Sequence, residues 1–169
     1  VFHISYWCTW PTDGGYYLQV SREFSQGASL YSGESETAYP PGVFLLYRLW
    51  FAVVGESLLL AQVPVIAALF ASSCIAALAV FRLTDRRDLA LITFAATQFA
   101  WVNYETTQLL LEVFLSFWSI AAFALVAGFR LTGRRVPWVL VGVCLGTTLL
   151  FKQIAVVYLL TFLIWMSLD

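Results

Sequence analysis

Uninterrupted apolar segments, separated by short charged ones, make up most of the chain after residue 57. A helix that crosses a membrane needs about 20 mainly apolar residues, and two of the segments are that long. The apolar segments are residues 58–81, 89–104, 109–129, 137–151 and 154–168. The pattern predicts an all-α fold, a polytopic transmembrane helical bundle formed by residues 58–169.

Residues 1–57 have a different pattern, with acidic and aromatic side chains mixed and with the turn-forming sequences Asp13-Gly14-Gly15 and Pro40-Pro41-Gly42. Residues 43–54 are apolar but too short to cross a membrane, and they include Arg48. They are typical of an amphipathic helix that lies at a membrane surface. Residues 16–24 predict a second short helix, with Asp13 as its N-cap.

Most of the basic residues are confined to two short turns. Six of the nine are Arg82, Arg86, Arg87, Arg130, Arg134 and Arg135. Loops rich in arginine and lysine generally face the cytoplasm, so we expect both turns there. The tight turn at residues 105–108 and residues 1–57 are then expected on the extracytoplasmic side.

Composition supports this interpretation, since 61% of the residues are hydrophobic and 11% are charged, whereas soluble domains have roughly 25% charged residues. The basic residues form no stripe of the kind that binds nucleic acid. We expect an integral, multi-pass membrane protein, in the plasma membrane of a prokaryote or the endoplasmic reticulum of a eukaryote. Both ends abut apolar segments, which predicts that the chain is a fragment of a longer membrane domain.

Three motifs follow one another along the chain. Residues 13–42 (DGGYYLQVSREFSQGASLYSGESETAYPPG) combine an acidic residue, a helix, a glycine-containing turn and Tyr39-Pro40-Pro41. Residues 109–125 carry Glu112 near one end, and residues 140–165 contain a glycine-rich helix followed by Lys152. In this order they resemble the GT-C-fold membrane glycosyltransferases, and most of all the dolichyl-phosphate-mannose–protein mannosyltransferase-like group (glycosyltransferase family 39 and relatives).

The resemblance implies a GT-C-like helical bundle and an inverting glycosyltransferase. Such an enzyme transfers a sugar from a polyprenyl-phosphate-linked donor to an acceptor on the extracytoplasmic side, and the chain alone would be inactive. Two departures leave the sugar and the acceptor (protein, lipid or glycan) open. Gly14 follows Asp13 where many members have Asp-Glu, and Tyr39 replaces the lysine of a Lys-Pro-Pro motif.

Asp13 is the candidate catalytic residue. A carboxylate at the start of the loop could take the proton from an attacking acceptor hydroxyl. The same oxygens could instead hold a divalent metal ion that neutralises the leaving phosphate, although no metal or other cofactor is certain. The alternative is that Asp13 only caps a helix.

Four further residues are candidates for substrate binding: Tyr39, Glu105, Glu112 and Lys152. Glu105 and Glu112 are seven residues apart, a spacing that places them on one helical face. Glu112 lies inside an apolar segment, so we expect it to face the protein interior, as a site residue or as a structural partner of Arg48 or Lys152. Lys152 could attract a phosphate or act as an interfacial anchor.

The sequence leaves a second function open, that of a non-enzymatic transporter or channel subunit. Such proteins often contain inverted repeats, broken helices and charges at the membrane midplane. The acidic residues gather in residues 1–57 and near the expected outer end of residues 109–129, which favours the enzyme. The Lys152-Gln153 step between two apolar segments fits the transporter better.

Overall fold

The computed structural model describes residues 13–31, 39–102 and 111–167. These residues are helical apart from turns and short connections, and none of them forms a β-strand. The helices are α2 (Asp13–Ser25), α3 (Gly42–Val54), α4 (Leu58–Ala61), α5 (Val63–Thr84), α6 (Arg87–Val102), α7 (Leu111–Leu131), α8 (Trp138–Phe151) and α9 (Ala155–Ser167). The all-α prediction is therefore confirmed for this part of the chain.

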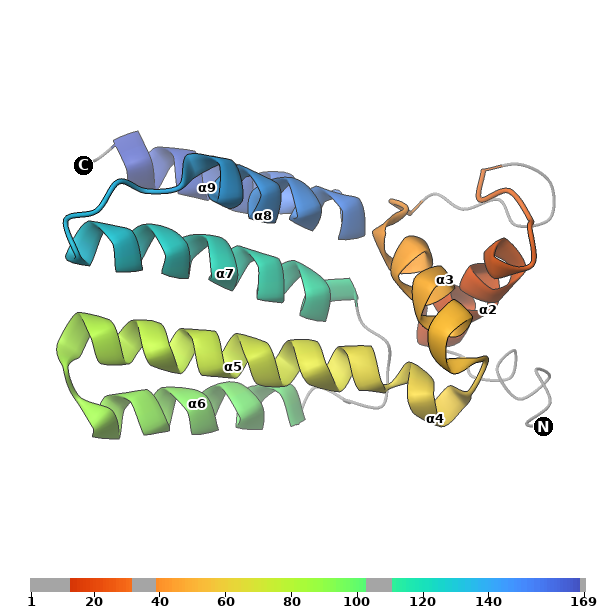
Figure 1. The fold of residues 1–169 in the computed structure, drawn as a ribbon, viewed down its shortest axis with the longest axis horizontal. Helices are drawn as coiled ribbons and strands as arrows, with labels where there is room; N and C mark the ends of the chain where they lie inside the picture. Colours follow the sequence, from red (N-terminus) through yellow and green to blue (C-terminus); the bar gives the residue numbers. More distant parts are fainter. Residues whose placement is uncertain (1–12, 32–38, 103–110, 168–169) are drawn as a thin grey trace.

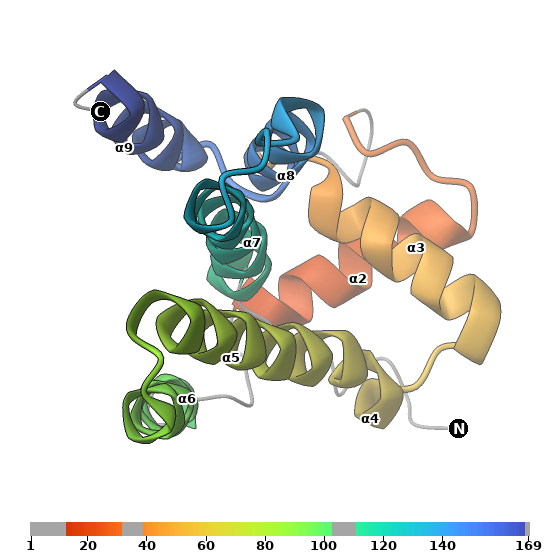
Figure 2. The same ribbon diagram turned by 60° about the vertical axis from the view of Figure 1, so that its left-hand side comes forward.

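The molecule is an elongated bundle with a helical lobe at one end. Helices α5 to α9 run along the long axis, and α2, α3 and α4 form the lobe (Figure 1). In the bundle, α5 packs on both α6 and α7, and α7 packs on α8. Figure 2 shows these helices as a curved row, α6, α5, α7, α8, with α9 to one side of α7 and α8. The ring of Phe162 on α9 packs on Phe123 of α7, with centroids 5.2 Å apart.

An apolar face of α3 is buried in a cluster that also contains Leu111 and Phe151 of the bundle. Val43, Phe44, Tyr47 and Phe51 are buried on that face. The first residue, Gly42, lies directly against the end of α8, where an added Cβ would collide with the carbonyl oxygen of Leu150 and lie 2.7 Å from its carbonyl carbon. Only glycine therefore permits α3 and α8 to approach this closely.

The segment expected to be one helix over residues 58–81 is interrupted at Gln62, between α4 and α5. Pro64 lies in the first turn of α5 and has no N–H to donate to the carbonyl of Leu60. Trp50 of α3 supplies the missing donor, with its Nε1 2.9 Å from the Leu60 oxygen. The neighbouring carbonyl of Ala61 accepts a hydrogen bond from the Tyr47 hydroxyl at 2.6 Å. Burial raises the pKa of Tyr47, which keeps this hydroxyl protonated.

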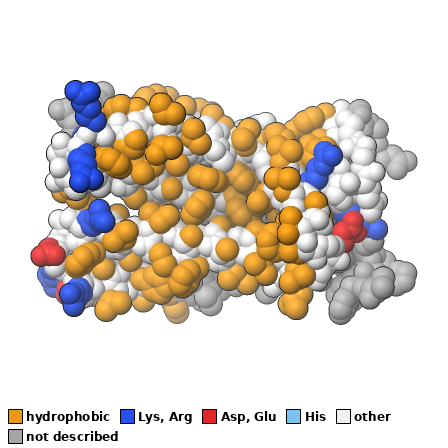
Figure 3. Space-filling view, viewed as in Figure 1, with side chains coloured by type: hydrophobic (Ala, Val, Ile, Leu, Met, Phe, Trp, Pro, Cys, Tyr) orange, Lys and Arg blue, Asp and Glu red, His pale blue; other side chains and the backbone are white. Residues whose placement is uncertain are grey.

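The two arginine-rich turns lie at the same end of the bundle, opposite the lobe (Figures 1 and 3). We call this end, residues 82–87 and 130–135, the arginine end. The fifth residues of the similar sequences FRLTDRR and FRLTGRR, Asp85 and Gly133, both adopt a left-handed backbone conformation. In the first turn the Arg86 guanidinium donates to the Asp88 carboxylate and lowers the pKa of Asp88.

Two helical segments are long and apolar enough to cross a membrane: Leu59–Thr84, which includes most of α4 and all of α5, and Leu111–Leu131, which is α7. Apolar side chains cover much of the bundle surface between the two ends (Figure 3). Leu91, Phe99 and Val139 are between 69% and 80% exposed. The membrane-like character of the sequence is thus visible on the surface of the fold.

Candidate functional site

Two of the candidate residues form an ion pair at the end of the bundle opposite the arginine end. Glu112 lies in the first turn of α7, and Lys152 follows the last residue of α8. The Lys152 ammonium group donates a hydrogen bond to the Glu112 carboxylate. The side chains are 34% exposed for Lys152 and 45% exposed for Glu112, so a ligand can reach both of them.

The sequence neighbours of this pair explain why it forms. Leu111 and Phe151, which precede Glu112 and Lys152, are both buried in one apolar cluster. Phe151 also stacks on Phe114, with ring centroids 5.1 Å apart. These contacts fix the start of α7 beside the end of α8. The charged side chains then extend from a rigid apolar base.

Lys152 lies in a break between two apolar helices. Helix α8 ends at Phe151, Lys152 has an extended backbone (φ −155°, ψ 138°), and α9 begins at Ala155. The two separate segments that the sequence predicts on either side of Lys152 and Gln153 correspond to these helices. A lysine at such a break can turn its ammonium group toward the helix ends instead of the apolar helix sides.

Arg48, the other partner considered for Glu112, has a different contact. Its guanidinium carbon lies 4.4 Å from the ring centroid of Phe24, within the distance at which a cation and an aromatic face attract each other. This contact ties α3 to α2 inside the lobe. The structural alternative for Glu112 is therefore the pair with Lys152.

Tyr39 lies in an aromatic cluster against α2. Its ring centroid is 5.1 Å from that of Tyr17 and 6.1 Å from that of Tyr16. Tyr17 in turn packs on Phe44 of α3 at 6.2 Å. Tyr39 is thus held beside the first turns of α2, and it packs against the same apolar cluster that contains Leu111 and Phe151.

Asp13 is the first residue of α2, whereas the sequence predicts it as the cap just before the helix. Its side chain is outside the described part of the structure, and so is the whole of Glu105. The roles of these two residues, and their positions relative to the ion pair, stay predictions. Among the described residues no group of three His, Cys, Asp or Glu side chains could hold a metal ion, so a metal at Asp13 also stays a prediction.

The lobe also contains an ion pair that the sequence does not predict. The Arg22 side chain on α2 donates to the Glu56 carboxylate at 2.6 Å, and Gln26 donates to the same carboxylate at 3.4 Å. Glu56 lies just before α4, so the contact ties α2 to the entry of the bundle. The residues are 34 positions apart, and no spacing pattern in the sequence links them.

Comparison of the chain with protein-family models, with curated proteins and with solved structures found no match.

Proposed function

We propose that the chain belongs to a multi-pass membrane glycosyltransferase of GT-C type. In this proposal the enzyme transfers a sugar from a polyprenyl-phosphate-linked donor to an acceptor on the extracytoplasmic side. The arginine end faces the cytoplasm, and the lobe lies at the opposite membrane surface. The proposal combines the resemblance of the three sequence motifs with the position of the Glu112–Lys152 pair.

The surface of the bundle supports a membrane location. In the most apolar 18-residue stretch of Leu59–Thr84, only 22% is buried. In the corresponding stretch of Leu111–Leu131, 39% is buried. Core helices of soluble proteins bury most of their apolar side chains. Here the apolar surface runs from an arginine-rich end to a lobe that carries both apolar and charged side chains (Figure 3). This is the distribution expected for helices surrounded by lipid.

The observation that carries the enzyme proposal is the accessible ion pair at the junction with the lobe. A polyprenyl phosphate has an apolar chain and a charged head, so its phosphate has to be bound where the lipid meets water. Lys152 is a cation at this junction, and Glu112 holds its ammonium group in place. A donor phosphate could replace the Glu112 carboxylate at the Lys152 ammonium group or bind this group together with the carboxylate, because the ammonium group carries three donor hydrogens.

In the proposed reaction the acceptor hydroxyl oxygen attacks the anomeric carbon of the sugar. The bond between that carbon and the phosphate oxygen breaks, and polyprenyl phosphate leaves with the electron pair. Asp13 takes the hydroxyl proton. Lys152 stabilises the charge that develops on the phosphate, and the aromatic cluster around Tyr39 offers a face on which a sugar ring could stack.

Replacing Asp13 with Asn tests the proposal in the full-length protein. Asn keeps a side-chain oxygen that can accept a hydrogen bond at a helix N-terminus, so folding should change little. General-base catalysis contributes about 10²–10⁴-fold, and we expect transfer of radiolabelled sugar from polyprenyl-phosphate donors to fall on that scale. Glu112→Gln should give a smaller loss, because Glu112 positions Lys152 and does not take the proton.

Expression and detergent melting, measured on the same preparations, show whether each variant is folded. A folded Asp13→Asn protein with near wild-type transfer would contradict the catalytic role of Asp13. A melting defect in Glu112→Gln would instead assign Glu112 a structural role.

A transporter or channel subunit is the second candidate, favoured by the helix break at Lys152. Charged residues at interrupted helices bind substrates or ions in many transporters. Solute flux into vesicles that contain the full-length protein distinguishes the two functions. Flux that requires Lys152, in a protein without sugar transfer, would favour the transporter.

A further inference from the structure

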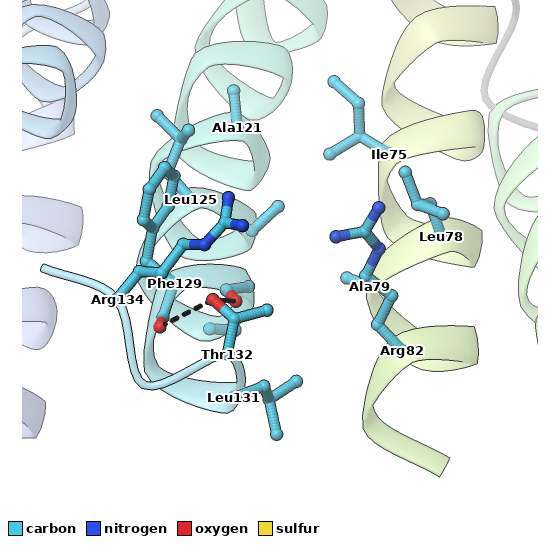
Figure 4. A pocket seen from close by; sticks show the side chains of 13 residues that line it. Ile75, Leu78, Ala79, Arg82, Ala121, Leu125, Phe129, Leu131, Thr132 and Arg134 are labelled. Carbon is cyan, nitrogen blue, oxygen red and sulfur yellow. Dashed lines mark hydrogen bonds between the residues drawn. The ribbon is translucent and has the colours of Figure 1, made fainter. Parts of the chain in front are cut away.

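A cavity of about 440 Å³ opens between α5 and α7 near the arginine end. Its volume lies in the range of about 300–1,000 Å³ that is usual for small-molecule sites. Most of its lining is apolar, and the polar exceptions include Arg82 and Arg134. Figure 4 shows that both guanidinium groups point into the space between the two helices.

Small side chains on α7 create this space. Ala121, Ala124 and Gly128 line the cavity, and their spacing of three and four residues places them on one face of the helix. A Cβ added at Gly128 would meet no atom within 4 Å. The cavity lies in the part of the α5–α7 interface beside the arginines.

The backbone turn after α7 holds Arg134 beside the cavity. The amide of Arg134 donates to the carbonyl of Phe129 at 3.0 Å, and the amide of Gly133 donates to that of Arg130 at 3.1 Å. These are the paired bonds of a Schellman motif, which requires a left-handed residue such as Gly133. The chain therefore reverses sharply, and the Arg134 side chain extends toward α5 (Figure 4).

Neither cavity arginine has a carboxylate partner within the described ranges. The Asp88 carboxylate, at the start of α6, already accepts a hydrogen bond from the Arg86 guanidinium. Two guanidinium groups thus lie at one end of an apolar cavity, and no carboxylate of the described residues forms an ion pair with them. A ligand that matches this arrangement has an anionic head and an apolar tail.

We propose that the cavity binds an anionic phospholipid of the cytoplasmic leaflet. The lipid phosphate lies between Arg82 and Arg134, each of which can donate two hydrogen bonds to phosphate oxygens, and an acyl chain fills the apolar space along α7. The inference goes beyond the proposed reaction and does not depend on it. It rests only on the multi-pass arrangement that places the arginine end at the cytoplasmic surface.

The test measures retention of phosphatidylglycerol by the purified full-length protein in mixed detergent micelles, with native mass spectrometry as the readout. The test variant is Arg82→Gln with Arg134→Gln. The matched control is Arg87→Gln with Arg135→Gln, which removes the same charge from the same two turns but from residues that do not line the cavity. A third variant, Ala124→Phe, fills the cavity and leaves the charge unchanged.

We expect the test variant to bind phosphatidylglycerol at least about tenfold more weakly than the wild type, because charge-assisted hydrogen bonds are lost. The control should stay within about twofold, since it loses only long-range attraction to the lipid. Ala124→Phe should also lose binding. Phosphatidylcholine and inorganic phosphate, which lack the net negative charge or the acyl chains, should bind weakly to the wild type.

Equal losses in the test and control variants would overturn the proposal, because general electrostatic attraction would then explain the binding. Equal retention of phosphatidylcholine and phosphatidylglycerol would overturn it as well. A dimer that dissociates in Ala124→Phe would show that a second copy occupies the cavity. Sugar transfer by the Asp13 variants is measured separately, so failure of the lipid site leaves the transferase proposal standing.

Discussion

Two side chains of α3 donate hydrogen bonds to carbonyls just before α5, and one of them replaces the donor that Pro64 lacks. Trp50 and Tyr47 donate to the carbonyls of Leu60 and Ala61, where the helix is interrupted. The Ala61 carbonyl is buried, and a buried carbonyl without a donor costs about 1–3 kcal/mol, whereas the bond to Leu60 is exposed. These two hydrogen bonds therefore make α3 part of the support for the helix that begins at Val63.

Tyr47→Phe should lower the free energy of unfolding by about 1–3 kcal/mol, because the Ala61 carbonyl then loses its donor at a buried position that solvent does not reach. Tyr158→Phe on α9 is the control. Tyr158 is 39% exposed, and Tyr158→Phe should change the free energy of unfolding by no more than about 0.5 kcal/mol. Thermal unfolding in detergent compares the two. Equal melting of both variants would show that the Tyr47 hydrogen bond contributes little.

At this scale the sequence predicted partners only in part. Glu112 inside an apolar segment required a polar partner, and Lys152 was one of two candidates. The sequence does not show whether Glu112 pairs with Lys152 or with Arg48. In the structure Arg48 contacts the Phe24 ring instead. The Arg22–Glu56 pair could not be predicted, because a contact between distant residues of a short lobe leaves no periodic signal.

The close contact between α3 and α8 is the main link between the lobe and the bundle at the scale of elements. Gly42 at the start of α3 lies against the backbone of Leu150. Backbone atoms at the end of a helix cannot move aside as a flexible side chain can. The position of α3 beside Lys152 therefore depends on the absence of a side chain at residue 42.

Gly42→Ala should destabilise the protein by about 1–3 kcal/mol, the usual cost of overpacking, and should loosen the lobe. Gly146→Ala on α8 is the matched control, since a Cβ there meets no atom within 4 Å and alanine favours the helix by about 0.5–1 kcal/mol. Limited proteolysis between the lobe and the bundle, together with melting, measures both effects. A Gly42→Ala protein as stable and as resistant as Gly146→Ala would contradict the close contact.

Helix positions were largely predictable, because each long apolar segment ends at charges, glycine or proline. The expected segments 109–129 and 137–151 correspond to α7 and α8 with shifts of at most two residues. The break at Gln62 was missed, because Pro64 is tolerated in the first turn of a helix as well as inside one. The predicted turn at residues 105–108 lies outside the described residues.

At the scale of the whole molecule, the bundle has two chemically different ends. Both arginine turns gather at one end, and the lobe lies at the other (Figures 1 and 3). The Glu112–Lys152 pair, at the start of α7 and the end of α8, lies at the same end as the lobe. The sequence predicted this polarity from the alternation of charged and apolar segments. It could not predict which helices pack together or that a cavity would open beside Arg82, since both depend on contacts between distant segments.

We propose that a membrane separates these two ends, with the lobe outside and the arginine end in the cytoplasm. Single cysteines at Ser35 and Thr132, in a full-length protein whose own cysteines are replaced, test it through labelling of intact cells with an impermeant maleimide. We expect labelling at Ser35 in intact cells and at Thr132 only after permeabilisation. Labelling of both positions from the same side would contradict the placement of the lobe and the arginine end on opposite sides of the membrane.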